Sequence, residues 1–318
     1  MRTTTLGSTG ITVTELCFGA SPIGSLPGLY SHAVDEDRGV ATVEAVLDSP
    51  IRFLDTSNGY GTAGESETRI GMALKQHGLP DDVVIATKVD PATGSEDFSG
   101  DRVRRSFEES LERLGLDRVP LLHLHDPERI TFEQGVAADG PLRALVELKE
   151  RGLVDAIGVA GGPVGLLRRY LDTGEFDVVL SHNRFTLLDR SAEPLFRVAR
   201  ERGLGVLNAA PYGGGILSQG SAAVPRYAYG LGSKATVEAA RAMEEACARY
   251  DVPIAAAALQ FSLRSDLVDS TVVGMSSPER VAATQELAAR EIPDELWAEL
   301  AALLPDSGSW LDADEQPA

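Results

Sequence analysis

Short apolar runs alternate with stretches of helical periodicity along almost the whole chain, and this alternation limits the possible folds more than any other feature. Strands buried on both faces of a parallel sheet read as continuous apolar runs. Such runs occur at 16–20, 51–54, 83–87, 119–124, 154–160, 177–181, 204–208 and 270–273. The helical stretches between and after them are 36–48, 65–77, 101–114, 141–151, 163–173, 191–202, 233–250, 253–264, 278–289 and 293–304. The regular exchange of the two patterns predicts an α/β protein with a parallel sheet.

The stretch DRVRRSFEESLERL shows the helical pattern clearly. Its apolar residues recur at spacings of four, four and three: Val103, Phe107, Leu111 and Leu114. These spacings place all of them on one face of a helix. Gly115 then follows as the residue that ends the helix.

Eight strand–helix repeats predict a closed (β/α)8 barrel, a TIM barrel, in preference to an open doubly wound sheet. No GxGxxG follows the first predicted strand, which argues against a Rossmann fold. Residues 1–15 differ from the rest, because two alternating arms flank GSTG and predict a β-hairpin that plugs the bottom of the barrel. We expect one domain over 1–318, with a tail at 306–318 that is loosely held after Trp310.

Composition narrows the class of protein. The 318 residues include 48 acidic and 29 basic side chains, a formal net charge of −19, which argues against a nucleic-acid or anionic-membrane partner. The chain has no apolar run long enough to cross a membrane, and we expect no signal peptide at its start. Cys17 and Cys247 lie far apart, and we interpret them as free buried thiols in a reducing compartment, the cytoplasm. The oligomeric state stays open.

Ionisable residues collect at the predicted carboxyl ends of three successive strands, where barrel enzymes carry their active sites. Asp55 ends the second strand and Tyr60 follows in its loop, Lys88 ends the third, and His125 ends the fourth. A tyrosine hydroxyl is a weak acid at neutral pH, and we expect the Lys88 ammonium to lower its pKa while Asp55 holds that ammonium. His125 adds a hydrogen bond to the same reacting oxygen. This set predicts proton transfer to a carbonyl or from an alcohol.

Two other interpretations use the same residues. One is a metal-dependent barrel hydrolase, because a strand end carries the possible metal ligands His123, His125 and Asp126. His182 lies near a later strand end and could add a further ligand. We expect no metal, and we assign His123, on the same face as His125 but deeper, a structural role. A non-catalytic protein that senses a cofactor on the same fold is the other alternative.

The chain resembles the aldo-keto reductases over roughly residues 3–305. The resemblance rests on LGSTGITVTELCFG, FLDTSNGYG, GESETRIGMAL, IATKV, LLHLHDP, LVELKERGLVDAIGV, LLDR and GMSSPERVA. It implies a (β/α)8 barrel, a nicotinamide cofactor bound without a Rossmann fold, and reversible carbonyl reduction. The family's catalytic tetrad then falls on Asp55, Tyr60, Lys88 and His125, with Tyr60 as the general acid and base.

The variants NGYG, LHDP and NAAPYGGG resemble the branch of aldose (fucose or galactose) 1-dehydrogenases and pyridoxal reductases. Three customary nicotinamide contacts are replaced here, by Ala160-Gly161-Gly162, by His182 and by Ala209. We therefore expect the cofactor to be held by a different set: His182, Asn183, Pro211, Tyr212, Gly213, Gly214, Gly215, Gly274, Ser276, Ser277 and Arg280. The glycines allow backbone N–H groups to approach a pyrophosphate.

The same resemblance predicts the ligands. The family's lysine near the ribose phosphate is Gly274 here and its serine is Met275, while Ser277 and Arg280 remain. We expect NADP(H) to be preferred by a modest margin, with NAD also used. The substrate is a small aldehyde or sugar hemiacetal, with Tyr30 and Trp310 as candidate selectivity residues.

Overall fold

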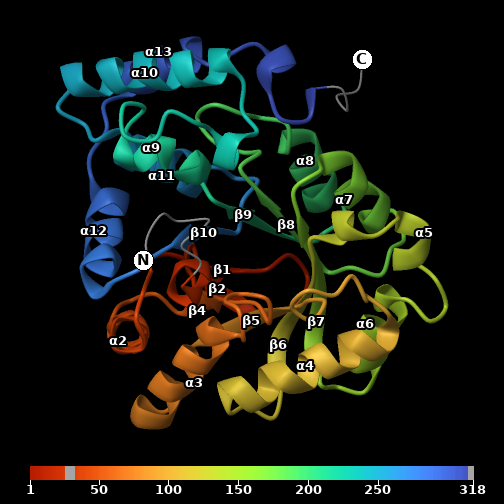
Figure 1. Cartoon of the computed structure of the whole chain (residues 1–318). Helices are drawn as coiled ribbons and strands as arrows, with labels where there is room; N and C mark the ends of the chain where they lie inside the picture. The colour runs from red at the N-terminus through yellow and green to blue at the C-terminus, as the bar shows by residue number, and fades with distance from the viewer. Residues whose placement is uncertain (26–32, 314–318) are drawn as a thin grey trace.

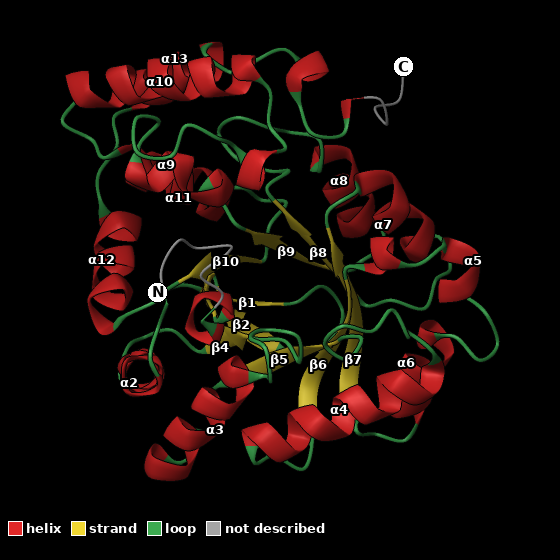
Figure 2. Cartoon of the chain, viewed as in Figure 1, coloured by secondary structure: helices red, strands yellow, loops and turns green. Residues whose placement is uncertain are grey.

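Eight parallel strands close into a barrel in the order β10-β3-β4-β5-β6-β7-β8-β9, which confirms the predicted fold (Figure 2). The structure is a computed structural model that describes residues 1–25 and 33–313. The barrel strands are β3 (Leu16–Gly19), β4 (Phe53–Asp55), β5 (Val84–Val89), β6 (Val119–His125), β7 (Val154–Gly161), β8 (Val178–His182), β9 (Gly205–Ala209) and β10 (Ser270–Gly274). Each matches a predicted apolar run to within two residues at each end.

Helices surround the barrel and connect its strands (Figure 1). The long ones are α2 (Glu36–Leu47), α3 (Glu65–His77), α4 (Gly100–Leu114), α6 (Pro141–Glu150), α7 (Val164–Leu171), α8 (Glu193–Glu201), α10 (Lys234–Arg249), α11 (Ile254–Leu263), α12 (Pro278–Ala289) and α13 (Asp294–Ala302). All of them were predicted. The short helices α5 (Phe132–Gly135) and α9 (Ile216–Gln219), and the 3-10 turns η1 (Ser21–Gly24), η2 (Pro127–Arg129), η3 (Gly213–Gly215), η4 (Ala228–Gly230) and η5 (Ser307–Ser309), were not.

The amino-terminal hairpin closes one end of the barrel. Strands β1 (Thr3–Thr5) and β2 (Thr12–Thr14) pair antiparallel. The side chains of Leu6, Ile11 and Val13 are buried in one apolar cluster with barrel residues such as Phe53. The amide of Ser8 also donates to the carbonyl oxygen of Gly203, just before β9, at 2.8 Å. The hairpin therefore covers the amino ends of the strands and leaves the carboxyl ends open.

Two further expectations concern the cysteines and membrane-spanning segments. Cys17 and Cys247 are both free and buried, as expected. In the part of the chain that the structure describes, no helix combines the length and the apolar character needed to cross a bilayer.

The chain after Trp310 is held in place where the structure describes it, so the prediction of a loose tail is wrong for Leu311 and Asp312. The amide of Leu311 donates to Asp189 at 2.8 Å. Asp312 accepts from the guanidinium of Arg184 at 2.7 and 3.0 Å and from the amide of Val164 at 2.9 Å. These contacts tie the tail to residues that follow β7 and β8. Sequence polarity alone does not reveal them, because the partners lie more than a hundred residues away.

Candidate active site

The four ionisable residues predicted to meet do meet at the carboxyl end of the barrel. Asp55 is the last residue of β4, Lys88 lies in β5, and His125 is the last residue of β6. Tyr60 lies in the loop between β4 and α3. All four line one cavity of about 1020 Å³.

Lys88 is the centre of this group. Its side chain is 1% exposed, and its ammonium donates to Asp55 at 2.5 Å, to the carbonyl oxygen of Thr56 at 2.7 Å and to the Tyr60 hydroxyl at 3.2 Å. The three N–H donors of the ammonium thus have three acceptors. A buried charge is tolerated only when it is paired in this way, so the contacts hold the ammonium beside the phenol oxygen of Tyr60.

The pKa of Tyr60 differs from the sequence-based expectation. Burial raises it well above its usual value, and the negative charges of Asp55, Asp126 and Asp90 raise it further. The expected lowering by Lys88 is therefore wrong for the free protein, because Asp55 next to the ammonium offsets the positive charge and burial penalises a phenolate. Tyr60 keeps its proton at neutral pH and is able to donate it.

His125 is held by a carboxylate that the sequence analysis did not identify. Its Nδ1 lies 2.8 Å from Asp90 and 3.1 Å from the hydroxyl of Ser57. Its ring meets that of Tyr60 edge to face, with the centroids 5.5 Å apart. Burial by itself would lower the pKa of His125, but the negative charges of Asp126 and Asp90 raise it above its usual range.

The deeper histidine, His123, is fully buried beside Lys88 in the neighbouring strand. Burial, with the positive charge of Lys88, holds its pKa well below the usual range. Neither ring nitrogen has a hydrogen-bond partner among the described residues. The expectation that it packs structurally fits this position, but a hydrogen-bonded partner for it is not found.

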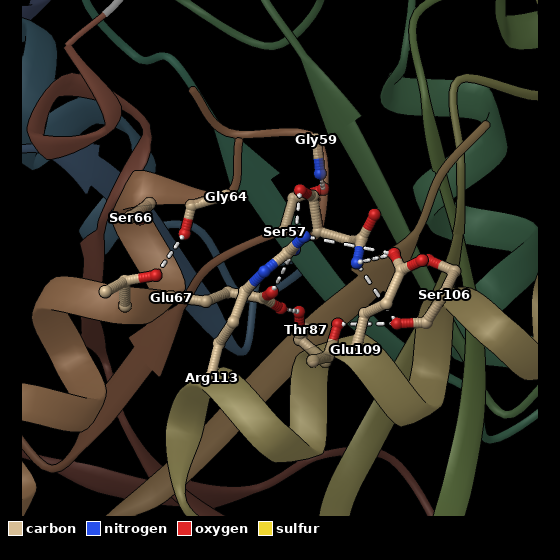
Figure 3. Close-up of polar contacts among 12 residues, drawn as sticks. Ser57, Gly59, Gly64, Ser66, Glu67, Thr87, Ser106, Glu109 and Arg113 are labelled. Carbon is tan, nitrogen blue, oxygen red and sulfur yellow. Dashed lines mark hydrogen bonds and ion pairs between the residues drawn. The ribbon is translucent and has the colours of Figure 1, made fainter. Parts of the chain in front are cut away.

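The loop that carries Ser57 to Tyr60 rests on a partly buried polar network (Figure 3). The side chain of Asn58 donates to Glu109 and to the carbonyl oxygen of Ser106, both at 3.1 Å and both on α4. The guanidinium of Arg113, also on α4, reaches Glu67 of α3 at 3.2 Å. These contacts join the loop to α4 and α4 to α3, and so they fix the loop on the barrel rim.

Nine of the eleven residues predicted to hold a cofactor line the cavity: His182, Asn183, Pro211, Tyr212, Gly214, Gly215, Gly274, Ser276 and Arg280. The donor set suits a nicotinamide dinucleotide. Asn183 is buried with its Oδ1 unpaired among the described residues. Gly214 and Gly215 have φ of +73° and +109°, conformations that favour glycine. Arg280 lies in the first turn of α12, where an anion is stabilised.

Other predicted ligand residues lie outside the lining. A side chain at Gly213 would collide with the buried ring of Tyr227, so this glycine serves packing. Ser277 caps α12 by accepting from the amide of Arg280 at 3.3 Å. The indole of Trp310 donates to the carbonyl oxygen of Pro305 at 3.1 Å and does not line the cavity. Tyr30 falls outside the described residues.

His182 and Asn183, two of the predicted cofactor ligands, contact each other in the cavity. The amide nitrogen of Asn183 lies 3.0 Å from Nδ1 of His182. An amide NH₂ only donates, so Nδ1 accepts and Nε2 carries the proton. Burial lowers the pKa of His182 to about 4, and the ring is neutral at physiological pH.

The two histidines of the metal-pair interpretation, His123 and His125, do not come together as ligands. Among the described histidines, cysteines and acids, the group with ligand atoms near enough to hold an ion is Asp126, Glu128 and His182, whose atoms lie within 4.8 Å of one another. That group contains Asp126 and His182, which the metal-pair interpretation named, but neither His123 nor His125. The ring of His123 is fully buried, and that of His125 is hydrogen-bonded to Asp90.

The sequence carried one signal for the missed carboxylate. Asp90 follows Lys88 by two residues, and residues at this spacing in a strand point to the same side. The cavity also contains Arg129 and Arg226, which were not predicted. Arg129 ends the short turn η2 and Arg226 lies in the loop before η4, and neither segment shows a periodic pattern in the sequence.

Comparisons with known proteins agree with this geometry. The model of the family described as "Aldo/keto reductase family" matches residues 15–305. L-galactose dehydrogenase of Arabidopsis thaliana is 37% identical, covering 94% of this chain and 93% of that protein. D-threo-aldose 1-dehydrogenase of a Pseudomonas species is 34% identical, covering 92% of this chain and 94% of that protein.

A solved structure gives the same result. The aldo-keto reductase AKR11C1 from Bacillus halodurans in its holo form superposes with a TM-score of 0.78 and 26% identity, covering 96% of this chain and 97% of that one. The family model and two relatives above 30% identity span nearly the whole sequence. On this evidence the chain belongs to the aldo/keto reductase family.

Proposed function

We propose that this oxidoreductase transfers a hydride between NAD(P) and an aldehyde or the hemiacetal carbon of an aldose. The observation that carries the proposal is the buried Lys88 ammonium, which binds Asp55 and the Tyr60 hydroxyl together inside the cavity. Two relatives named as aldose dehydrogenases support a sugar as the substrate.

Each residue of the group has a distinct part in this proposal. When bound, the nicotinamide supplies the hydride in reduction and takes it up in oxidation. Tyr60 donates a proton to the carbonyl oxygen in reduction and accepts it in oxidation. Lys88 orients the phenol and Asp55 keeps Lys88 in place, while His125 binds the same substrate oxygen.

The proposal is tested by assaying the purified protein with a panel of aldehydes and aldoses, with NAD and NADP in both directions. We expect turnover of at least one aldose or aldehyde. Tyr60→Phe should lower kcat roughly 10²–10⁴-fold and leave cofactor binding, followed by nicotinamide fluorescence, unchanged. Turnover that survives in the Phe variant would remove Tyr60 from the mechanism. Cofactor binding without turnover of any substrate would favour the cofactor-sensing alternative.

We further propose that NADP(H) is preferred to NAD(H) by a modest margin. Arg280 lines the cavity at the amino end of α12. Arg38 of α2 reaches the carbonyl oxygen of Ser276 at 3.4 Å and pairs with Glu279, so a second cation stands nearby but is partly neutralised. A guanidinium binds a phosphate through two parallel hydrogen bonds, and this favours NADP. The lysine that the resemblance would place at position 274 is a glycine here, so one cation fewer faces the phosphate and the expected margin is modest.

Arg280→Ala should abolish this preference. A charge-assisted hydrogen bond contributes about 1.5–3 kcal/mol, so the ratio of kcat/KM for NADP to that for NAD should fall to about one. Arg290→Ala is the matched control, because Arg290 ends the same helix and pairs with Asp251 away from the cavity. Strict use of NAD by the wild type, or an unchanged ratio in the Arg280 variant, contradicts the proposal.

A further inference from the structure

One buried carboxylate at the site has no part in the catalytic group described above. Asp90 is 2% exposed and follows the last residue of β5. Its carboxylate accepts hydrogen bonds from the Ser57 hydroxyl and from the amide of Gly59, the latter at 2.9 Å. The same carboxylate lies 2.8 Å from Nδ1 of His125. Three groups, two from the loop after β4 and one from the end of β6, thus converge on one side chain.

We propose that Asp90 is the positioning residue of His125, fixing its imidazole with the proton on Nδ1 and leaving Nε2 for the substrate oxygen. The inference rests on the proposed function in one respect, namely that His125 binds the substrate. The placement of the proton depends only on the contacts of the free protein.

The direction of each hydrogen bond follows from the donors available. A carboxylate only accepts, and Asp90 is ionised at neutral pH, since its pKa, despite burial, is lowered to about 2 by His125 and by hydrogen bonds. Ser57 gives its hydroxyl proton to Asp90. The nitrogen of His125 that faces both oxygens must therefore be the donor, and this selects one tautomer.

The same contacts exclude a hydrolytic triad built from serine, histidine and aspartate. In such a triad the serine and the aspartate bind opposite nitrogens of the imidazole. Here Ser57 and Asp90 both lie against Nδ1. The imidazole therefore cannot take the proton of Ser57, which instead donates to Asp90 and supports the carboxylate.

The protein holds Asp90 rigidly. Its amide donates to the Ser106 hydroxyl at 3.0 Å, and its carbonyl oxygen accepts from Arg102 at 2.9 Å. A side chain at Gly59 would collide with the carboxylate, so the glycine before Tyr60 makes room for it. The stretch that contains Tyr60 therefore also leaves the space that the Asp90 carboxylate occupies.

Several charged groups surround His125, and the test must separate Asp90 from the rest. Asp126 lies 3.6 Å from Nε2, and Arg129 lies 3.7 Å from Asp90. The other titratable neighbours of His125, from the strands and loops packed against it, are Asp55, Tyr60, Lys88, His123, Glu128 and His182. Among these groups, Asp90 is the carboxylate hydrogen-bonded to Nδ1.

The position of the proton decides what His125 offers a substrate. With Nδ1 protonated, a neutral ring presents Nε2 as an acceptor, and a charged ring presents it as a donor. The negative charge of Asp90 favours the charged ring. Reduction, in which Nε2 should donate to a carbonyl oxygen, is therefore sustained to higher pH than an isolated imidazole would allow.

The test follows the nitrogen shifts of histidines in the uniformly ¹⁵N-labelled full chain as a function of pH. The chain has five histidines, and the signal of His125 is identified by its loss in His125→Gln. Three variants are compared with the wild type: Asp90→Asn, Asp90→Ala and Asp126→Asn. Asp126→Asn is the matched control, because it removes an equal charge near the ring without touching Nδ1.

Asp90→Ala should lower the pKa of His125 by about 1–3 and populate the form with the proton on Nε2. Asp90→Asn should lower that pKa but keep the Nδ1–H form, since its amide oxygen still accepts. Asp126→Asn should lower the pKa without changing the tautomer. In aldehyde reduction, kcat of both Asp90 variants should fall roughly 10–100-fold, by analogy with the loss on removing a carboxylate that orients a metal-bound histidine. The decline of activity at high pH should begin at a lower pH than in the wild type.

An unchanged tautomer in Asp90→Ala would overturn the inference, as would a loss of activity with an unshifted pH profile in both Asp90 variants, which would indicate a purely structural role. If the Ala variant fails to fold, an unshifted His125 pKa in Asp90→Asn overturns it equally. The nitrogen shifts are read without substrate, so failure of the proposed function would show itself separately, as absence of turnover in the wild type.

Discussion

At the scale of single residues, the site depends on one buried ion pair. The side chains of Lys88 and Asp55 are 1% and 3% exposed, and the second carboxylate oxygen of Asp55 has no partner among the described residues. Burial raises the pKa of Asp55, while the charge and hydrogen bond of Lys88 oppose that rise. Neither residue is well accommodated without the other, because an unpaired charge in the interior is costly.

Lys88→Met should therefore lower the free energy of unfolding by about 3–5 kcal/mol, because it leaves Asp55 buried and unpaired. Adding Asp55→Asn to this variant should restore much of the loss, although both proteins are expected to be inactive. Urea unfolding followed by circular dichroism measures the difference. Equal stability of the single and the double variant would mean that the pair is not coupled as the contacts indicate.

At the scale of elements, two neighbouring strands place the deeper histidine. His123 of β6 stands opposite Gly158 of β7 in the register of the sheet. A Cβ at Gly158 would overlap Nδ1 and Cε1 of the His123 ring. The glycine in the middle of β7 therefore makes room for an imidazole next to Lys88, and this explains a residue that otherwise weakens strands.

Gly158→Ala should lower the free energy of unfolding by about 1–3 kcal/mol through overpacking against His123. Gly308→Ala is the matched control, because a side chain there meets no atom within 4 Å. In the double variant His123→Ala/Gly158→Ala the new methyl group enters the space that the ring vacates, so the two losses should not add. Thermal and urea unfolding are measured for the wild type, Gly158→Ala, His123→Ala, the double variant and the Gly308→Ala control. Additive losses in the double variant would contradict the packing argument.

At the scale of the whole molecule, the carboxyl face collects residues from the entire chain. Loops after β4, β5, β6, β8, β9 and β10 all contribute to the cavity, and the described end of the chain is bound to the same side through Arg184 and Asp312, both 7% exposed. The net charge of −19 repels an anionic ligand, so binding of such a ligand would depend on local cations, and Arg280 is one that lines the cavity. The single-domain organisation stays a prediction.

The sequence by itself determined the order of the strands and helices, the barrel, and the meeting of Asp55, Tyr60, Lys88 and His125. Each of these follows from local periodicity and from the rule that parallel strands end at one face. The tertiary structure alone decided the contact between Asp90 and His125, the raised pKa of Tyr60 and the binding of the tail by Arg184. The reason is physical: distances of 3 Å between loops, and the extent to which water is excluded from a side chain, depend on how distant segments pack, and the spacing of residues along the chain does not encode either quantity.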